Sequence, residues 1–285
     1  MTTDNKPEQQ QIDFWLEDAE RDVQRILKYR DNGFEFYKKE NLPIQTGYRA
    51  LANYYADLGY AQFLSGAPRD VFRASFTTAA EYIIKVFKMT YDKNDPDYVG
   101  DKPPTDHAGF GWGCLDWWAV NEQKFITGEQ YALIGANFDK AKELAEWYRN
   151  VPEEYQSDEI VHQRFAHALK FAVMGVKDPG KSLLWKSLTE MHGKKTKDPF
   201  KLNYLNQTQT LYGILDNDEE RFNQGLELQV AMHLIWVKQE DAVDTPYEYI
   251  CDDAVALANL GIGFGMKLTF EHYTLPEGLV MLPVA

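Results

Sequence analysis

Apolar residues recur every three or four positions along most of this 285-residue chain, and that spacing restricts its fold more than any other feature. Residues three and four apart lie on the same side of an α-helix, so the pattern predicts helices with one buried face. We therefore predict a mainly α protein, a multi-helix array of antiparallel helix pairs that is loosely solenoid-like. The pattern is clearest near the N-terminus, in Ile12, Trp15, Leu16, Ala19, Val23, Ile26 and Leu27.

Turn residues divide the remaining chain into further helices. Residues 48–66 and 68–89 predict a helical hairpin, because Gly66 and Pro68 interrupt the pattern between them and proline is tolerated in a first helical turn. After the last helix, residues 266–276 alternate apolar and polar side chains, which predicts a short strand or extended C-terminal segment. The other predicted helices are at 113–121, 127–132, 138–149, 158–174, 181–191, 200–215, 219–238 and from 252 onward.

Two polar segments fall outside the helical pattern. We expect residues 1–11 to be flexible and residues 12–285 to form a single all-helical domain. Within that domain, residues 91–106 are polar, proline-rich and aperiodic, which predicts a long surface loop. Its aspartates are compatible with a calcium-binding loop. However, Pro96 and Pro103 break the ligand pattern of such a loop, and no glutamate occupies the twelfth loop position. A solvated loop is the favoured interpretation.

Negative charge is concentrated in the last third of the chain. Residues 216–253 contain eleven acidic side chains against Arg221 and Lys238, in a chain of net charge −14. The same segment contains apolar residues that require burial, so it predicts a folded acidic surface that attracts a basic partner and repels nucleic acid and anionic membranes. Helix starts, which favour negative charge, explain part of this acidity. The residues that we expect to contact a partner are Asp218, Glu219, Glu220, Glu240, Asp241 and Asp244.

No catalytic or metal-binding motif accompanies the acidic segment in the sequence. His162 and His167 are five residues apart and would point about 140° apart around a helix, so they would not share a metal. The glycine-rich residues 109–113 lack the Lys-Ser ending of a phosphate loop. Paired carboxylates such as Asp252-Asp253 arise by chance at this acidity. We therefore predict a protein that is not an enzyme and that has no catalytic residue, cofactor or metal.

The termini and cysteines indicate the compartment. The first eleven residues contain no basic and apolar signal sequence, and no stretch reaches the roughly 18 apolar residues of a membrane span. Cys114 and Cys251 are far apart and are expected to be reduced core thiols. These features predict a cytoplasmic protein that does not bind membranes.

The C-terminal third has a recognisable layout over residues 205–236 and 244–280. A helix ends at Ile214-Leu215-Asp216, the next helix has an early Phe222 and a later His233, and the chain closes on Tyr-x-x-Pro at 273–276. This layout resembles the immunity protein 49 family of bacterial polymorphic toxin systems, from which the glycine-dense residues 260–266 depart. A second helical immunity class, cognate to nuclease toxins of the PoNe type, has a similar composition. The resemblance transfers no catalytic residue and implies a helical bacterial protein that neutralises a co-encoded toxin by binding it.

The function predicted from charge, helical pattern and resemblance is that of an immunity protein. It would bind and neutralise a specific co-encoded antibacterial toxin by covering a basic active-site or substrate surface. Two alternatives stay open: a helical adaptor or chaperone that binds peptide or protein partners, and, less favoured, an α-helical enzyme that uses a carboxylate pair.

Overall fold

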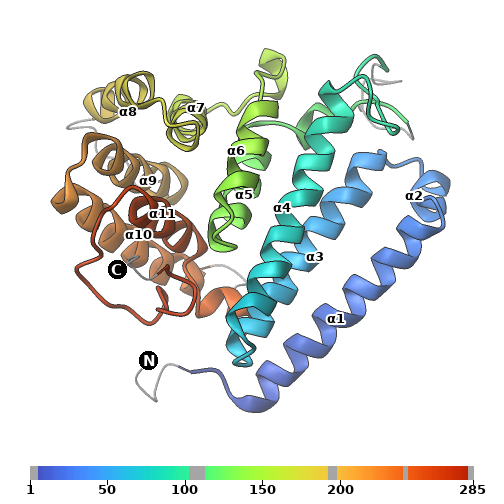
Figure 1. Ribbon diagram of the computed structural model, residues 1–285, viewed down its shortest axis with the longest axis horizontal. Helices are drawn as coiled ribbons and strands as arrows, with labels where there is room; N and C mark the ends of the chain where they lie inside the picture. The colour runs from blue at the N-terminus through green and yellow to red at the C-terminus, as the bar shows by residue number, and fades with distance from the viewer. Residues whose placement is uncertain (1–5, 103–112, 192–197, 240–242, 282–285) are drawn as a thin grey trace.

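The protein is built from helices (Figure 1). The computed structural model describes residues 6–102, 113–191, 198–239 and 243–281. Within these ranges no strand is assigned, which confirms the prediction of a mainly α protein. The α-helices there are α1 (Gln9–Asp31), α2 (Glu35–Lys39), α3 (Ile44–Leu64), α4 (Arg69–Tyr91), α5 (Glu122–Ile134), α6 (Phe138–Trp147), α7 (Ile160–Val173), α8 (Lys177–Met191), α9 (Pro199–Asp216), α10 (Glu219–Gln239) and α11 (Asp252–Gly263).

Helices that are neighbours in the sequence are mostly neighbours in space. Figure 1 shows α1, α3 and α4 on one side of the molecule, α5 and α6 in the middle, and α7 to α10 on the other side. Adjacent packing of successive elements is usual in compact domains. The last helix departs from this order, because α11 packs back onto α5, α9 and α10. It thereby joins the middle of the array to its C-terminal part.

The helical hairpin predicted at 48–66 and 68–89 is present as α3 and α4. The turn between them contains Gly66, whose φ of 80° favours glycine, and Pro68 immediately precedes α4. The two helices approach closely where the ring of Phe76 lies against Gly59. Tyr60 meets Phe76 edge to face, with ring centroids 4.8 Å apart. Local turn chemistry and a row of aromatic contacts, of which Tyr60–Phe76 is one, thus hold this pair together.

The N-terminal helix is longer than the sequence pattern predicts. α1 begins at Gln9, so residues 9–11 are helical where we expected a flexible segment; residues 1–5 lie outside the described residues. α1 packs along α3 and buries the predicted face through Ile12, Trp15, Ala19, Val23 and Ile26. The short α2 was not predicted, since five residues are too few to show a helical period.

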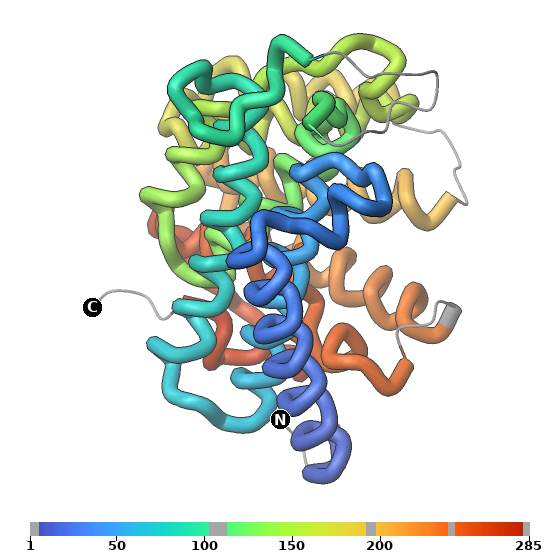
Figure 2. The backbone as a smooth tube through the Cα atoms, turned by 90° about the vertical axis from the view of Figure 1, so that its right-hand side faces the viewer, coloured from blue at the N-terminus to red at the C-terminus, as the bar shows by residue number. Residues whose placement is uncertain are grey.

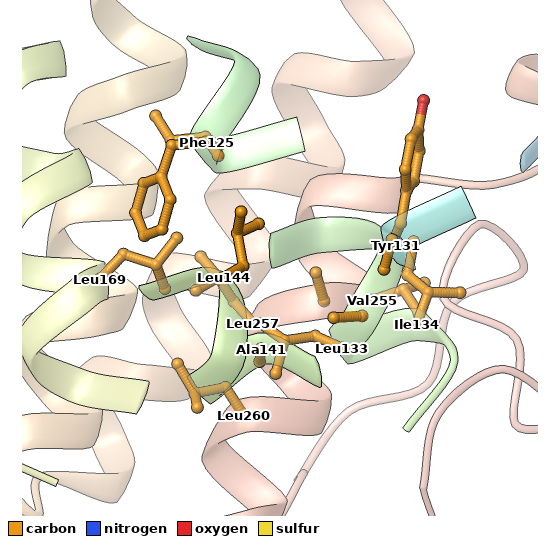
Figure 3. Packing of buried hydrophobic residues seen from close by; sticks show 14 of the residues in the cluster. Phe125, Tyr131, Leu133, Ile134, Ala141, Leu144, Leu169, Val255, Leu257 and Leu260 are labelled. Carbon is orange, nitrogen blue, oxygen red and sulfur yellow. The ribbon is translucent and has the colours of Figure 1, made fainter. Parts of the chain in front are cut away.

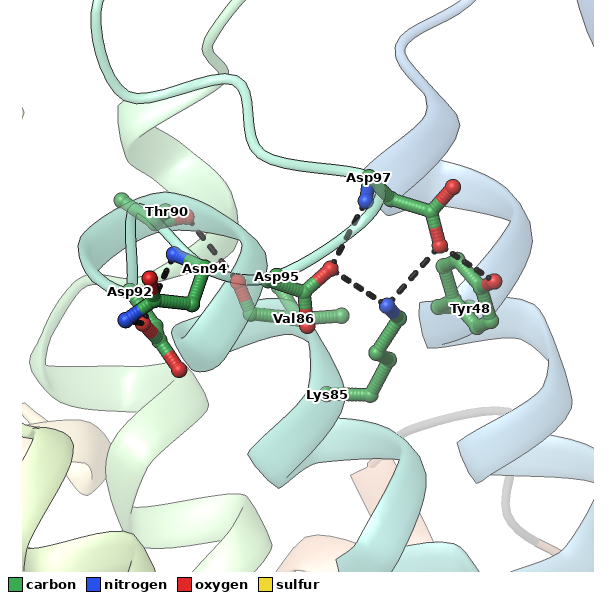
Figure 4. A network of polar contacts seen from close by, with 8 residues as sticks. All are labelled: Tyr48, Lys85, Val86, Thr90, Asp92, Asn94, Asp95 and Asp97. Carbon is green, nitrogen blue, oxygen red and sulfur yellow. Dashed lines mark hydrogen bonds and ion pairs between the residues drawn. The ribbon is translucent and has the colours of Figure 1, made fainter.

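The loop after α4 is tied to the helices by one lysine (Figure 4). Lys85 Nζ lies 2.5 Å from Asp95 Oδ1 and 2.8 Å from Asp97 Oδ2. Asp97 also accepts a hydrogen bond from the Tyr48 hydroxyl at 3.0 Å. These aspartates therefore face a cation supplied by the protein itself, which agrees with a loop that is not a calcium site; residues 103–106 lie outside the described residues.

Residues 113–121 differ from their predicted secondary structure, whereas residues 266–276 lack only the strand, one of the two forms predicted for them. At 113–121 the structure contains only the 3₁₀ helix η2 (Trp117–Ala119) instead of an α-helix. The buried Gln45 side chain explains this, because it accepts from Asp116 N at 2.9 Å and donates to Asp116 O at 3.3 Å. At 266–276 no strand is assigned, and several N–H groups there donate to side chains. Thr269 N, for example, donates to Asn223 Oδ1 at 2.9 Å.

The main core surrounds α11 (Figure 3). This helix is buried along residues 254–261 and, apart from Asn259, is apolar there, as expected for a helix enclosed by others. Figure 3 shows its Val255, Leu257 and Leu260 among side chains of α5, α6 and α7. One connected cluster of buried apolar side chains extends from Ala52 in α3 to Val280 near the C-terminus.

Candidate protein-binding surface

The acidic segment singled out in the sequence folds around α10. Asn217, in the left-handed conformation with φ of 59°, ends α9 and reverses the chain. Asp218 then caps α10, since its Oδ1 accepts from Arg221 N at 3.0 Å. Glu219 and Glu220 occupy the first turn, where the helix dipole favours negative charge. The acidic cluster at this end therefore has a local structural role.

The inner face of α10 is buried against α9 and α11. Its buried apolar residues include Phe222, Leu226 and Val230. Close approach to the antiparallel α9 depends on Gly213, because a Cβ there would lie 2.5 Å from Phe222 N. This face belongs to the core and is not available to a partner.

The outer face of α10 exposes apolar residues among its polar ones. Leu228, Ile235 and Trp236 keep 45%, 46% and 41% of their surface exposed, and Val243 beyond the helix keeps 51%. Ala231, between Leu228 and Ile235, is exposed as well. Residues 228, 231 and 235 are spaced by three and four, so they lie along one line of the helix surface. We call Leu228, Ala231 and Ile235 the outer stripe.

The structure separates the six predicted partner-binding residues. Asp218, Glu219 and Glu220 lie at the start of α10, whereas Asp244 follows its other end. A helix of 21 residues spans about 30 Å, so these two groups do not form one patch. Glu240 and Asp241 lie outside the described residues. Their participation in binding stays a prediction.

Asp244 takes part in a structural contact between distant segments. Its carbonyl oxygen accepts from Trp15 Nε1 at 3.1 Å, and its carboxylate accepts from Gln11 Nε2 at 3.2 Å. Its own N–H donates to Glu248 Oε2 at 2.9 Å. The residue also has a positive φ of 62°. Asp244 thus ties the segment after α10 to α1, a role that the sequence does not reveal.

A second acidic group surrounds the start of α11. Asp253 Oδ2 accepts from Asn203 Nδ2 and Gln207 Nε2, each at 2.9 Å, and Asp253 also binds Gln130. Asp252 Oδ2 accepts from the buried Tyr60 hydroxyl at 3.4 Å. These partners lie on α3, α5 and α9, between 46 and 192 residues away in the sequence. No local sequence signal could have identified them.

Burial changes the acidity of these carboxyl groups. Asp57 on α3, which accepts from the Tyr247 hydroxyl at 2.9 Å, has its pKa raised to about 6 by burial. Burial is the main cause that raises the pKa of Asp252, and the negative charge of Asp253 raises it further. The pKa of Asp253 is raised by burial and held down in part by its amide donors. Burial therefore favours the protonated form of each of these carboxyl groups.

The space beside Asp253 is small. A cavity of about 10 Å³ lies there, lined by Gln130 and Gln207 and by apolar residues of α5, α7 and α11. That volume is the room that a single water molecule needs. The cavity could therefore hold a water bound to Asp253, but it has no room for a sugar or a nucleotide.

Among the described residues, the ionisable side chains do not assemble into a metal centre. In the described ranges no group of three or more His, Cys, Asp or Glu side chains could hold a metal ion. His162 and His233 are buried, and burial lowers the pKa of each imidazole to about 4. Both cysteines are free and buried. Among the helices described, none is long and apolar enough to cross a membrane.

Comparison of the chain with models of known protein families, with curated proteins and with solved structures finds no significant match. The surfaces of the fold are then the basis for a functional proposal, and α10 offers the most distinctive of them.

Proposed function

We propose that this chain is an immunity protein, which binds and neutralises a specific co-encoded antibacterial toxin in the cytoplasm of the producing cell. It would do so by covering a basic active-site or substrate surface of the toxin. The observation that carries the proposal is that α10 exposes apolar side chains beside acidic ones. Interfaces between proteins commonly combine an apolar or aromatic centre with a charged rim.

The charge of the chain supports a basic partner. A net charge of −14 raises the rate of encounter with a positively charged protein and disfavours encounter with nucleic acid. Enzymes that cleave nucleic acid require a basic surface for their substrate, and an acidic protein can cover that surface. Binding of this kind needs no catalytic group in the immunity protein.

The proposal is tested by co-expression with the toxin gene adjacent to the gene of this chain. Growth should be rescued, and the two purified proteins should elute as one complex from a size-exclusion column. A toxin that kills equally well in the presence of this chain would refute the proposal.

The contribution of charge is tested separately by the association rate of the purified pair. Glu220→Lys with Glu227→Lys should slow association at low salt by roughly tenfold, because both residues are exposed acids on α10. The matched control is Asp13→Lys with Glu20→Lys, which reverses two exposed acids on α1. An equal effect of the control would show that only the net charge matters.

A helical adaptor is the second candidate, and the exposed outer stripe favours it too. Apolar helix faces are used by proteins that bind peptides of several partners. An adaptor would bind several partners weakly, whereas an immunity protein would bind one partner tightly. Titration of the purified chain with the adjacent toxin and with unrelated toxins distinguishes the two.

A further inference from the structure

The exposed apolar residues of α10 form a continuous feature. Single exposed apolar side chains are normal on protein surfaces. Here, however, the outer stripe of Leu228, Ala231 and Ile235 is extended sideways by the exposed Trp236. Figure 2 shows α10 in orange at the edge of the molecule, next to α9. The stripe therefore lies where another molecule can reach it.

The opposite face of the same helix already serves the core. Phe222, Leu226 and Val230 bury that face against α9 and α11. A helix that is apolar on both sides is typical of one enclosed by other helices. In the part of the chain that the structure describes, the outer stripe stays exposed, so its cover would come from another molecule.

The charges around the stripe select the kind of partner. The exposed acids Glu220 and Glu227 lie on α10 with the stripe, and Lys238 is an exposed base near the end of the helix. Arg221 is occupied, since it pairs with Asp218 and lies over the ring of Tyr212. A second copy of the chain or an anionic membrane would bring like charge to this surface and be repelled.

We propose that the outer stripe docks an amphipathic helix of the protein partner, with aliphatic residues along one face and Lys or Arg residues beside them. Ridges of aliphatic side chains on such a helix would fit the grooves beside Leu228 and Ile235. The flanking bases would face Glu220 and Glu227. This inference rests on the proposed function and names the surface and the partner element that would carry it.

The first test uses a designed helical peptide of 21 residues, with leucines spaced by three and four and lysines elsewhere. Its affinity for the full-length chain is measured by fluorescence anisotropy. Leu228→Asp and Ile235→Asp should each weaken binding at least tenfold, and Trp236→Ala should do so to a similar degree. The same peptide with glutamates in place of lysines should not bind.

Matched controls are available on other helices. Phe14 on α1 and Trp185 on α8 are exposed to 62% and 52%, so Phe14→Asp and Trp185→Ala change comparable apolar surface elsewhere. Circular dichroism confirms that every variant is folded. Failure of the unmodified chain to bind the lysine peptide, or equal loss of binding in the controls, would overturn the inference.

The second test separates this inference from the proposed function. Full neutralisation of the adjacent toxin by the Ile235→Asp chain would remove the stripe from the interface and leave the immunity role intact. Loss of neutralisation with Ile235→Asp but not with Phe14→Asp supports both. Peptide binding confined to the stripe, without any protection from the toxin, supports the docking surface and refutes the immunity role. A dimer of the unmodified chain that Ile235→Asp dissociates would assign the stripe to a second copy and overturn the inference.

Discussion

His162 allows a quantitative test of the core around α7. The imidazole is only 2% exposed, and neither ring nitrogen has a hydrogen-bond partner among the described residues. It lies between aromatic rings, with its centroid 4.3 Å from that of Tyr204 and 5.7 Å from that of Phe200. The proposed change is His162→Phe, which keeps an aromatic ring but removes the ionisable group.

The expected magnitude follows from the pKa. Burial lowers the pKa of His162 from 6.5 to about 4. Between these values the unfolded chain binds a proton that the folded chain does not, so acid favours unfolding. At about 1.4 kcal/mol per pKa unit, the histidine costs the protein roughly 3 kcal/mol of stability as the pH falls from 6.5 to 4. The phenylalanine variant should not lose this amount.

The assay is urea unfolding followed by the helical circular dichroism signal at several pH values. The free energy of unfolding of His162→Phe minus that of the unmodified chain should increase as the pH is lowered, by roughly 3 kcal/mol over this range. His162→Gln serves as a control. It should show the same pH dependence but lower stability than the phenylalanine variant throughout, because a polar group stays buried.

A difference that does not change with pH would refute this reasoning. It would mean that the imidazole becomes charged as easily in the folded protein as in the unfolded one. Titration of the His162 ring by NMR near its ordinary pKa would have the same meaning.

Three further changes probe other parts of the fold. The free energy of unfolding of Asp57→Asn minus that of the unmodified chain should increase by roughly 2–4 kcal/mol as the pH rises from 3.8 to about 6. In this range the folded chain with Asp57 binds a proton that the unfolded chain does not, so the unmodified chain loses stability as the pH rises. Urea unfolding at several pH values measures this difference, and a difference that does not change with pH contradicts the prediction. Gly213→Ala should destabilise the protein by about 1–3 kcal/mol, since the new Cβ would clash with the backbone of Phe222. An unchanged melting temperature would mean that α9 and α10 can move apart at no cost in stability. Lys85→Met should remove the ion pair with Asp95 and make residues 92–102 more sensitive to limited proteolysis. An unaltered cleavage pattern would mean that other contacts hold these residues in place.

The positions of most helices could be predicted from the sequence. α10 was expected at 219–238 and lies at Glu219–Gln239, because both its cap and its period are local properties. The segment at 113–121 shows the limit of such reasoning. Its backbone is bound by Gln45, a residue about seventy positions earlier, which no local pattern predicts.

The candidate surface could be located only in part. Acidity pointed to residues 216–253, but the apolar residues of this segment were expected to be buried. That expectation is wrong for Leu228, Ile235 and Trp236, which stay exposed on α10. Which acids lie together was not predictable. Asp218 and Asp244 flank opposite ends of α10.

Periodicity and capping are set by residues within a few positions of one another, so the amino-acid sequence alone identifies the helices and the charge that they carry. The exposure of Leu228 and Ile235, the pairing of Asp253 with three side-chain amides and the burial of His162 depend on contacts between helices far apart in the chain. Burial and hydrogen bonding are properties of the packed assembly of helices. For that reason only the tertiary structure decides which apolar face stays exposed and which carboxyl groups have a raised pKa.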